Sequence, residues 1–320
     1  MLNCAETAAV LRNWDNILVL SHASPDGDTL GSACALIRGL LALGKRARFA
    51  CADTIAPKYG YLFDGMPQED FAPEHVMTVD VVDLSLLGGL REQFEGRIEL
   101  AVDHHGTHVP FAPQRWVEPH SAATTELVFL LLQELGVGPD RAIADCIYTG
   151  LTTDTGCFRY RSVTPCTHRI AAEVIEWGAD AGEINRVMFE SKSKAQVEAE
   201  RIVLDGMEFF CGGKCAMVRV PRSVYETTGA ADSDLDGVAT LPRQIEGVVI
   251  GVTLKEKENG EVKASVRTNL PADSARLCAR FGGGGHKGAA GCSFPGITME
   301  KAAAQMTAAC EDYLRELNLL

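Results

Sequence analysis

The sequence predicts an α/β protein: an N-terminal domain with a mostly parallel sheet flanked by helices, and a smaller C-terminal α+β domain joined to it by a helical linker. Two patterns in the 320 residues lead to this prediction. In the first half of the chain, short apolar runs alternate with longer helical patterns, as expected of strands connected by helices. In the last third, apolar runs come in pairs around turns that contain glycine, as expected of antiparallel hairpins.

The first elements predict a βαβ unit. The apolar run NILVLS at 16–21 indicates a buried strand, 29–43 an apolar helix, and 47–52 a second strand. Strands of a parallel sheet are covered on both faces, so such runs are almost wholly apolar. The same reasoning predicts two more strands and two more helices, over 75–79, 98–102, 122–135 and 141–151.

The C-terminal part begins after a stretch of helical patterns. We expect a first domain over 1–190, a helical linker over 191–205 and a second domain over 206–320. In the second domain, two hairpins and a closing helix are predicted over 208–220, 248–268 and 299–317.

The composition is that of a globular protein, with 46% hydrophobic and 23% charged residues. The N-terminus has no basic stretch before an apolar one, and no run approaches about 18 apolar residues, so we expect a cytoplasmic protein with no membrane partner. The eleven cysteines are scattered and form no CxxC pair. Reduced thiols in a reducing compartment explain this pattern.

The net charge of −13 argues against one class of partner. Proteins that bind long nucleic acids usually carry a basic stripe, because neutralising phosphates supplies most of their affinity. This chain has no such stripe, and most of its excess acid lies within residues 1–204. We therefore expect no long nucleic acid as a partner and favour a small or short anionic substrate.

Potential metal ligands gather where the first predicted strand ends. In SHASPDGD at 21–28, proline and glycine indicate a tight turn, so that His22, Asp26 and Asp28 can point at one place. Carboxylates and imidazoles together suit divalent transition metals. Two alternatives stay open: Asp28 as the N-cap of the following helix, and His22 as a hydrogen-bonded structural histidine.

Three further acids follow predicted elements, and two of them are candidate ligands. Asp80 comes directly after the strand at 75–79, where its two oxygens could bridge two cations. Asp83 is better explained as the cap of a helix beginning near Leu84. Asp154, in GLTTDTG at 150–156, is a plausible last ligand, although the segment could also be an ordinary turn at the end of a helix.

The most specific short motif is Asp103-His104-His105, after the strand at 98–102. Adjacent histidines point in different directions, so one can coordinate a metal while the other faces a substrate. Asp103 can then fix the tautomer of a histidine. The alternative is a surface run without a role. His108 is interpreted as incidental.

A glycine-rich segment, GGGGHKGAAG at 282–291, predicts a cradle for a phosphate or a sugar. The backbone amides of Gly283, Gly284 and Gly285 can approach an anion closely, and His286 with Lys287 adds donors or charge. The GxxxxGK[ST] frame of a P-loop is absent. A flexible linker is the alternative.

Together, HASPDGDTLGS, VDVVD, VDHH, GLTTDTG and GGGGHKGAAG closely resemble, in the same order, the motifs of the DHH superfamily of phosphoesterases. Within it the chain is most similar to the NrnA-like oligoribonuclease and pAp phosphatase group, in which a DHH catalytic domain precedes a small DHH-associated domain. Family II pyrophosphatases share the N-terminal motifs, but their basic C-terminal stretch is missing here.

The resemblance implies a role for each candidate residue. Two divalent metal ions, with manganese the first choice, would be bridged by Asp80 and held by the set His22, Asp26, Asp28, Asp80, His104 and Asp154. His105, supported by Asp103, would act beside the scissile phosphate. Arg267, in ASVRT, would contact the substrate from the C-terminal domain, together with Gly283, Gly284, Gly285 and His286.

The implied activity is metal-dependent hydrolysis of short oligoribonucleotides, releasing mononucleotides from an end, and of the 3′-phosphate of pAp. The attack would be in line, by a hydroxide shared between the two metals. The alternatives are a phosphodiesterase for cyclic or linear dinucleotides such as cyclic di-AMP or pApA, an exopolyphosphatase, and a non-catalytic nucleotide-binding scaffold. The sequence itself does not indicate the oligomeric state, but paired catalytic domains are common among relatives, so the resemblance allows a homodimer.

Overall fold

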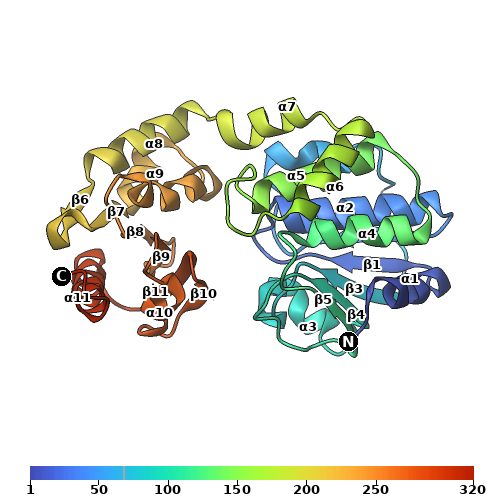
Figure 1. The fold of residues 1–320 in the computed structure, drawn as a ribbon, viewed down its shortest axis with the longest axis horizontal. Helices are drawn as coiled ribbons and strands as arrows, with labels where there is room; N and C mark the ends of the chain where they lie inside the picture. Colours follow the sequence, from blue (N-terminus) through green and yellow to red (C-terminus); the bar gives the residue numbers. More distant parts are fainter. Residues whose placement is uncertain (68) are drawn as a thin grey trace. The chain divides into compact units, whose positions relative to one another are not determined.

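The computed structural model describes residues 1–67 and 69–320. The chain divides into two compact units, Met1–Ser191 and Lys192–Leu320. Each unit has its own sheet and its own hydrophobic cores, and the colours of Figure 1 follow the chain from the first unit, in blue and green, to the second, in yellow and red.

The first unit is built on a five-stranded sheet with the order β2-β1-β3-β4-β5. Every neighbouring pair is parallel, so the carboxyl ends of all five strands share one edge. The strands are β1 (Ile17–Leu20), β2 (Ala47–Ala50), β3 (His75–Val79), β4 (Leu100–Asp103) and β5 (Gln114–Val117).

Helices cover both faces of this sheet, because successive strand residues point to opposite sides. In β1, Ile17 and Val19 join a core with the longer helices, whereas Leu18 and Leu20 pack on the other side with Phe94 of a short helix. Figure 1 shows α2, α4 and α5 on one side and α3 on the other. The helices are α1 (Cys4–Asn13), α2 (Gly27–Ala42), α3 (Arg91–Phe94), α4 (Thr124–Leu135), α5 (Arg141–Asp154), α6 (Pro165–Glu176) and α7 (Ala181–Asn185).

The predicted α/β class with a parallel sheet is confirmed, with two differences in detail. The strand expected over 98–102 is displaced to Leu100–Asp103, so the first acid of the DHH motif is itself the last strand residue. Strand β5 was not predicted: only Trp116 among its four side chains is buried, so it lacks the apolar run that marks the others.

The second unit has a six-stranded mixed sheet with the order β10-β11-β9-β8-β7-β6. Strands β7 and β8 are parallel, and the other neighbouring pairs are antiparallel, including the two predicted hairpins β6–β7 and β8–β9. The strands are β6 (Glu208–Phe210), β7 (Cys215–Val220), β8 (Ile250–Glu256), β9 (Val262–Thr268), β10 (Gly284–His286) and β11 (Ala289–Phe294).

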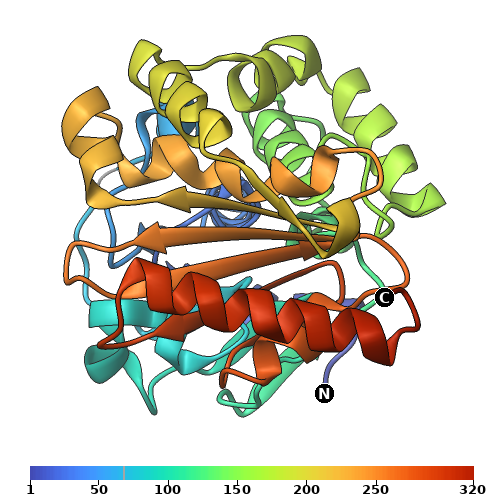
Figure 2. The ribbon, with the colours of Figure 1, turned by 90° about the vertical axis from the view of Figure 1, so that its left-hand side faces the viewer.

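Helices cover both faces of the second sheet as well. The C-terminal helix α11 (Met299–Glu316) runs across one face, as Figure 2 shows in red. Its Met306, Tyr313 and Leu314 share a core with α10 (Ser274–Ala279). On the other face, α8 (Lys194–Asp205) and α9 (Arg222–Thr228) pack together. Helix α8, in the segment expected as a linker, thus packs against the core of the second unit.

None of the helices in the described part of the chain combines the length and the apolar character needed to cross a membrane.

Candidate metal centre

The candidate ligands come together at the carboxyl edge of the parallel sheet. His22 and Asp80 follow β1 and β3, and Asp103 ends β4, ahead of His104 and His105. Because the carboxyl ends of parallel strands meet at one edge, segments far apart in the sequence converge there. Helices complete the set: Asp26 and Asp28 lie at the start of α2, and Asp154 is the last residue of α5.

Three overlapping groups of side chains each have ligand atoms within 4.8 Å of one another. The groups are His22, Asp26, Asp80; Asp28, His104, Asp154; and Asp80, His104, His105. All six residues predicted as metal ligands therefore lie in one cluster, and His105 lies beside them.

Asp80 lies between the first two groups. Its Oδ2 is 3.6 Å from His22 Nε2, and its Oδ1 is 3.7 Å from His104 Nε2. The backbone of Asp80 has φ of +59°, a left-handed conformation that is uncommon for residues other than glycine and costs about 1–3 kcal/mol. Such strain is kept where surrounding structure holds a functional side chain in place, and here it accompanies a carboxylate that faces both groups.

Hydrogen bonds fix the orientation of both imidazoles. His22 Nδ1 lies 2.8 Å from the carbonyl oxygen of Ala23, and His104 Nδ1 lies 3.1 Å from that of Ser121. Since a carbonyl can only accept, each Nδ1 carries a proton, so the neutral form of each ring has its lone pair on Nε2, the atom that faces the carboxylates. This is the tautomer that a metal-binding histidine uses.

The carboxylate of Asp28 is held by residues at the start of helix α4, a contact that the sequence interpretation did not predict. Its two oxygens accept from the backbone amides of Thr124 at 2.7 Å and Thr125 at 2.9 Å, and the Thr125 hydroxyl donates as well. Ala123, the N-cap of α4, makes no side-chain cap, so Asp28 supplies the acceptor instead. The hydroxyl of Thr124 donates to Asp80 Oδ1 at 2.9 Å.

The capping alternative raised for Asp28 belongs to its neighbour. Asp26 is the N-cap of α2, accepting from the amides of Asp28 and Thr29 at 3.0 and 3.1 Å. Asp83 has the capping role expected of it, since its carboxylate accepts from the amide of Ser85.

Close packing of α2 on α5 brings Asp154 to Asp28. A Cβ added at Gly31 of α2 would lie 2.5 Å from the carbonyl oxygen of Cys146 in α5, and one at Gly150 of α5 would lie 3.0 Å from Asp28 Oδ1 in α2. The two helices approach this closely only because these positions carry no side chain. The end of α5 can therefore reach the start of α2, where His104 Nε2 is 3.5 Å from Asp154 Oδ2.

Asp103 is fully buried and supports the second histidine of the motif. Its Oδ1 accepts from His105 Nδ1 at 2.8 Å and from the amides of His104 and His105. His108, interpreted from the sequence as incidental, donates from Nδ1 to Asp103 Oδ2 at 2.7 Å. That interpretation was wrong.

The substrate-binding candidates all lie in the second unit, on β9 and on or directly before β10, with β11 between these two strands. Arg267 of β9 pairs with Ala289 of β11, which in turn pairs with His286 of β10. Residues directly opposite one another across a sheet share a face, so the Arg267 and His286 side chains emerge on the same side of the sheet.

Two of the glycines before His286, Gly283 and Gly285, have a structural reason that the sequence interpretation did not give. The segment is not an open loop, because Gly284–His286 forms edge strand β10. A Cβ at Gly283 would lie 2.2 Å from the carbonyl oxygen of Gly291, and one at Gly285 would lie 2.7 Å from that of Ala289. At Gly284 a Cβ would meet no described atom within 4 Å, so packing does not explain this glycine.

Comparison with known proteins agrees with these two units. The DHH family, N-terminal domain, matches residues 16–151, and the DHHA1 domain matches residues 212–316. The bifunctional oligoribonuclease and PAP phosphatase NrnA of Thermus thermophilus is 32% identical over 310 residues, which span 95% of this chain and 92% of that protein. The chain belongs to the DHH family. The predicted resemblance to the family and to its NrnA-like group is confirmed.

Other DHH relatives extend over similar lengths. NrnA of Bacillus subtilis is 24% identical over 285 residues, which cover 88% of this chain and 90% of that protein. The crystal structure of an exopolyphosphatase-related protein from Bacteroides fragilis matches with a TM-score of 0.88 and 25% identity, over 98% of this chain and 97% of that one. The two-unit fold is therefore shared along the whole chain.

The charges of the DHH centre are poorly balanced without cations. Burial and the nearby charge of Asp80 raise the pKa of Asp28 to about 7, and burial with the charge of Asp28 raises the pKa of Asp154 well above its ordinary value. Burial alone would lower the pKa of His22, but its hydrogen bonds to Asp26 and Asp80 raise it to about 11. Protons thus take the place that a cation could fill.

The donor set fits divalent metal ions. Four carboxylates and two correctly oriented imidazoles surround one region, and Asp28 and Asp80 are buried although carboxylates are rarely buried without a partner cation. Oxygen and nitrogen donors in this mixture suit manganese, cobalt or zinc better than calcium.

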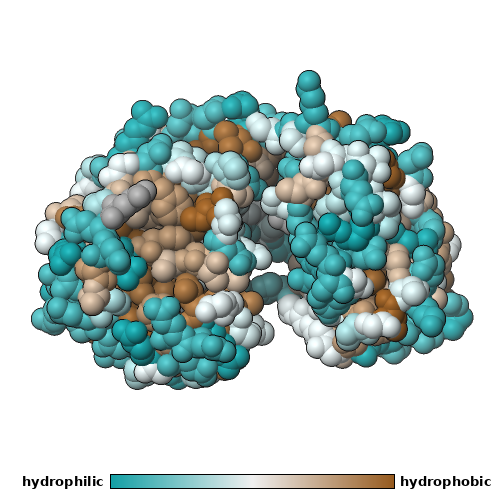
Figure 3. Space-filling model, turned by 180° about the vertical axis from the view of Figure 1, so that it is seen from behind, coloured by the Kyte–Doolittle hydropathy of each residue, from teal (hydrophilic) through white to brown (hydrophobic). Residues whose placement is uncertain are grey.

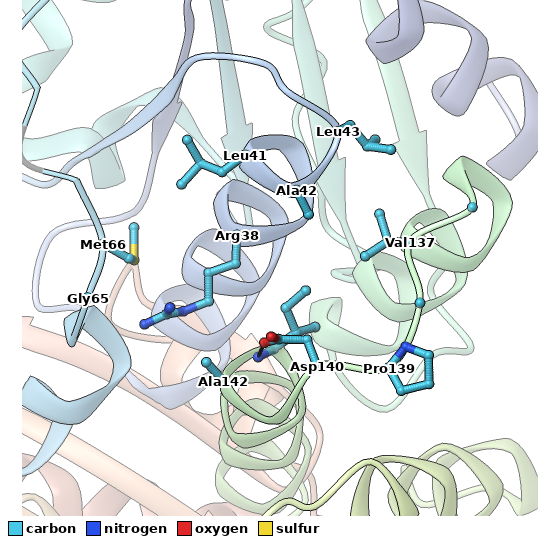
Figure 4. A pocket seen from close by; sticks show the side chains of 13 residues that line it. Arg38, Leu41, Ala42, Leu43, Gly65, Met66, Val137, Pro139, Asp140 and Ala142 are labelled. Atoms are coloured by element: carbon cyan, nitrogen blue, oxygen red, sulfur yellow. Dashed lines mark hydrogen bonds between the residues drawn. The ribbon is translucent and has the colours of Figure 1, made fainter.

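A separate pocket of the first unit, about 460 Å³ in volume, lies away from this cluster (Figure 4). None of the candidate ligands lines it. Two charged side chains that line it make structural hydrogen bonds. Arg38 donates from Nη2 to the carbonyls of Leu62 and Asp64, and Asp140 caps helix α5.

Proposed function

We propose that this DHH protein is a metal-dependent phosphoesterase that degrades short oligoribonucleotides from an end and removes the 3′-phosphate of pAp. The observation that carries the proposal is the convergence of two ligand groups on Asp80, whose two oxygens face one group each. The relatives that span nearly the whole chain are named for both reactions. The predicted class, a hydrolase of phosphoester bonds, is confirmed by membership of the family.

Two divalent ions would be held at the cluster, and we propose manganese for both. His22, Asp26 and Asp80 would hold one, and Asp28, His104 and Asp154 the other, with Asp80 shared. When bound, such ions supply the positive charge that acidifies a water molecule and neutralises the phosphoryl oxygens.

His105 would act on the phosphate directly. Asp103 holds its Nδ1 proton, so Nε2 is the atom able to meet a substrate. There it can stabilise charge on the phosphoryl group or move a proton to the leaving oxygen. Arg267 and His286, with Gly283, Gly284 and Gly285, would bind the remaining part of the substrate, and the guanidinium can hold a phosphate through two hydrogen bonds.

The test compares turnover of pAp, pApA, short RNA, cyclic di-AMP and polyphosphate with manganese. We expect pAp and RNA of a few nucleotides to be turned over fastest. Faster turnover of a cyclic dinucleotide or of polyphosphate would assign the protein to one of the two alternative activities. No turnover of any of the five would contradict the proposal.

Asp80→Asn provides the matching control for the site. The amide keeps the shape of the carboxylate but loses its charge, so we expect loss of at least about 100-fold in activity, as for other groups that hold reacting charge in place. Asp83→Asn changes an acid three residues away that caps a turn, and it should keep activity within about threefold. Full activity in Asp80→Asn would contradict the assignment of the centre.

The proposal includes the setting in which the enzyme acts. All eleven cysteines are free thiols, which fits a reducing cytoplasm.

Apolar side chains gather on the face of the first unit that Figure 3 presents, where a second copy could pack. Light scattering should give the mass of a homodimer, and a monomeric mass at micromolar concentration would contradict this part.

A further inference from the structure

His108 is bonded to the buried acid of the DHH motif. The Oδ1 atom of Asp103 accepts from His105 Nδ1 and from two backbone amides, whereas Oδ2 accepts from His108 Nδ1 at 2.7 Å. The carboxylate is thus held between two imidazole rings.

The position of His108 is set by the chain around it. Its amide donates to the carbonyl of His105 at 3.1 Å, which closes a turn directly after the motif, and the next amide, of Val109, donates to Val82. The imidazole is 4% exposed, and its ring lies 5.2 Å from that of Phe111. His108 is therefore an ordered side chain of the core around Asp103.

We propose that His108 is a positioning residue, which fixes the Asp103 carboxylate so that Asp103 can hold His105 in the orientation that meets the phosphate. The proposal rests on the proposed function for its kinetic consequence. It does not require His108 to touch a metal ion or the substrate, and none of the three ligand groups contains it.

The physical reason is that His105 and His108 bind the two oxygens of the same carboxylate, so a change at one oxygen moves the other. A buried carboxylate oxygen that loses its donor is costly to keep, so the group rotates toward other donors or admits water. Either change moves Oδ1 relative to His105 Nδ1. Partners of this kind change activity about 10–100-fold when they are removed, and we expect this loss in kcat with KM within about threefold.

Three substitutions at position 108 distinguish the effect of losing the hydrogen-bond donor from the effect of losing side-chain volume. His108→Ala removes the donor. His108→Asn places an amide N–H close to where Nδ1 stands, whereas His108→Gln places it near Nε2, too far along the side chain. We expect His108→Asn to restore kcat to within about threefold and His108→Gln to remain as low as His108→Ala. His75→Ala is the matched control, because it removes another imidazole–carboxylate bond, to Glu99, at the opposite end of β3.

A second readout is independent of activity. In metal-free protein labelled with ¹⁵N-histidine, the ring signal of His105 should report a proton on Nδ1 in the wild type and in His108→Asn. That proton should exchange faster or move to Nε2 in His108→Ala and His108→Gln. With eight histidines in the chain, His105→Gln assigns the signal by its absence.

The outcomes decide the proposal even if His108→Ala does not fold, since the Asn and Gln variants can be compared directly. Equal kcat in these two variants, or wild-type kcat in His108→Ala, would overturn it. So would an unchanged His105 ring signal in all three variants. If the wild type hydrolyses no phosphoester, the proposed function fails while the ring signal still tests the positioning.

Discussion

At the scale of single residues, the Thr124 hydroxyl holds the acid shared by both ligand groups. It donates to Asp80 Oδ1 at 2.9 Å and is fully buried. Thr124→Val keeps the shape of the side chain and removes this bond, so we expect manganese to bind about 10-fold more weakly. Isothermal titration measures the change. Thr7→Val removes a comparable buried hydroxyl in α1 and should leave the affinity unaltered; an equal loss in both variants would rule out a specific role.

Protons and metal ions should compete at this centre. The pKa of Asp28 is about 7 in the metal-free fold against 3.8 ordinarily, so between these values the folded state binds more protons than the unfolded state. The stability of the metal-free protein therefore falls as pH rises from about 4 to about 7. His22, with a pKa of about 11, acts in the same direction above about 6.5.

Metal binding must displace these protons, so the stabilisation by manganese should grow with pH from 5.5 to 8. At pH 8 and a concentration about 100 times Kd, we expect the melting temperature to rise on the order of 5–10 °C. Thermal denaturation with and without manganese measures this difference across the pH range. A shift that is constant or decreases with pH would show that the protons and the metal do not share the site.

The residue types of the ligands could be predicted because each stands in a short polar stretch after an apolar run. The residues that hold them could not. Thr124 and Thr125 lie about 96 positions from Asp28 in the sequence. Two threonines at the start of a helix are common, and nothing in the sequence indicates which distant carboxylate they will bind. His108 is part of no recognisable motif in the sequence. Its contact with Asp103 depends on the turn from His105 to His108, which is seen only in the folded structure.

At the scale of elements, the centre depends on how closely α2 and α5 approach. A methyl group at Gly31 would lie 2.5 Å from the backbone oxygen of Cys146, which cannot move aside as a side chain could. We expect Gly31→Ala to lower the free energy of unfolding by about 1–3 kcal/mol and to weaken metal binding, because α5 carries Asp154. Urea denaturation measures the first effect and titration the second.

Gly182→Ala serves as the control for this substitution. Gly182 lies in helix α7, and an added Cβ would meet no described atom within 4 Å, so we expect stability to stay unchanged or to rise by about 0.5–1 kcal/mol. Wild-type stability and metal affinity in Gly31→Ala would mean that the helices can separate without disturbing the centre.

Elements with a strong apolar pattern were predicted from the sequence, and those without one were not. Strand β1 consists of apolar residues and β3 buries four of its five residues, so both are recognisable, whereas β5 buries only Trp116 at an edge of the sheet. No strand was predicted in the glycine-rich segment, yet Gly284–His286 forms β10. Its pairing with β11 depends on how closely the two backbones approach, which hydrophobic periodicity does not record.

At the scale of the whole molecule, the two units carry different chemistry. The first gathers carboxylates and imidazoles at one sheet edge, and the second presents Arg267 and His286 on the same face of its sheet, with one strand between them. A centre that binds cations can act on many phosphoesters, so discrimination among them requires groups that recognise the rest of the substrate. We assign that recognition to the second unit.

This division predicts different kinetic effects for the two units. Arg267→Ala should raise KM for short oligonucleotides about 10–100-fold, as expected for loss of a charge-assisted phosphate contact, and leave turnover of an activated phenyl phosphodiester within about threefold. Arg219→Ala, two strands away in the same sheet and paired with Glu208, should change neither. The opposite result for Arg267→Ala, with oligonucleotide affinity kept and turnover of the small diester lost, would place this arginine at the reacting phosphate and remove the division of labour between the units.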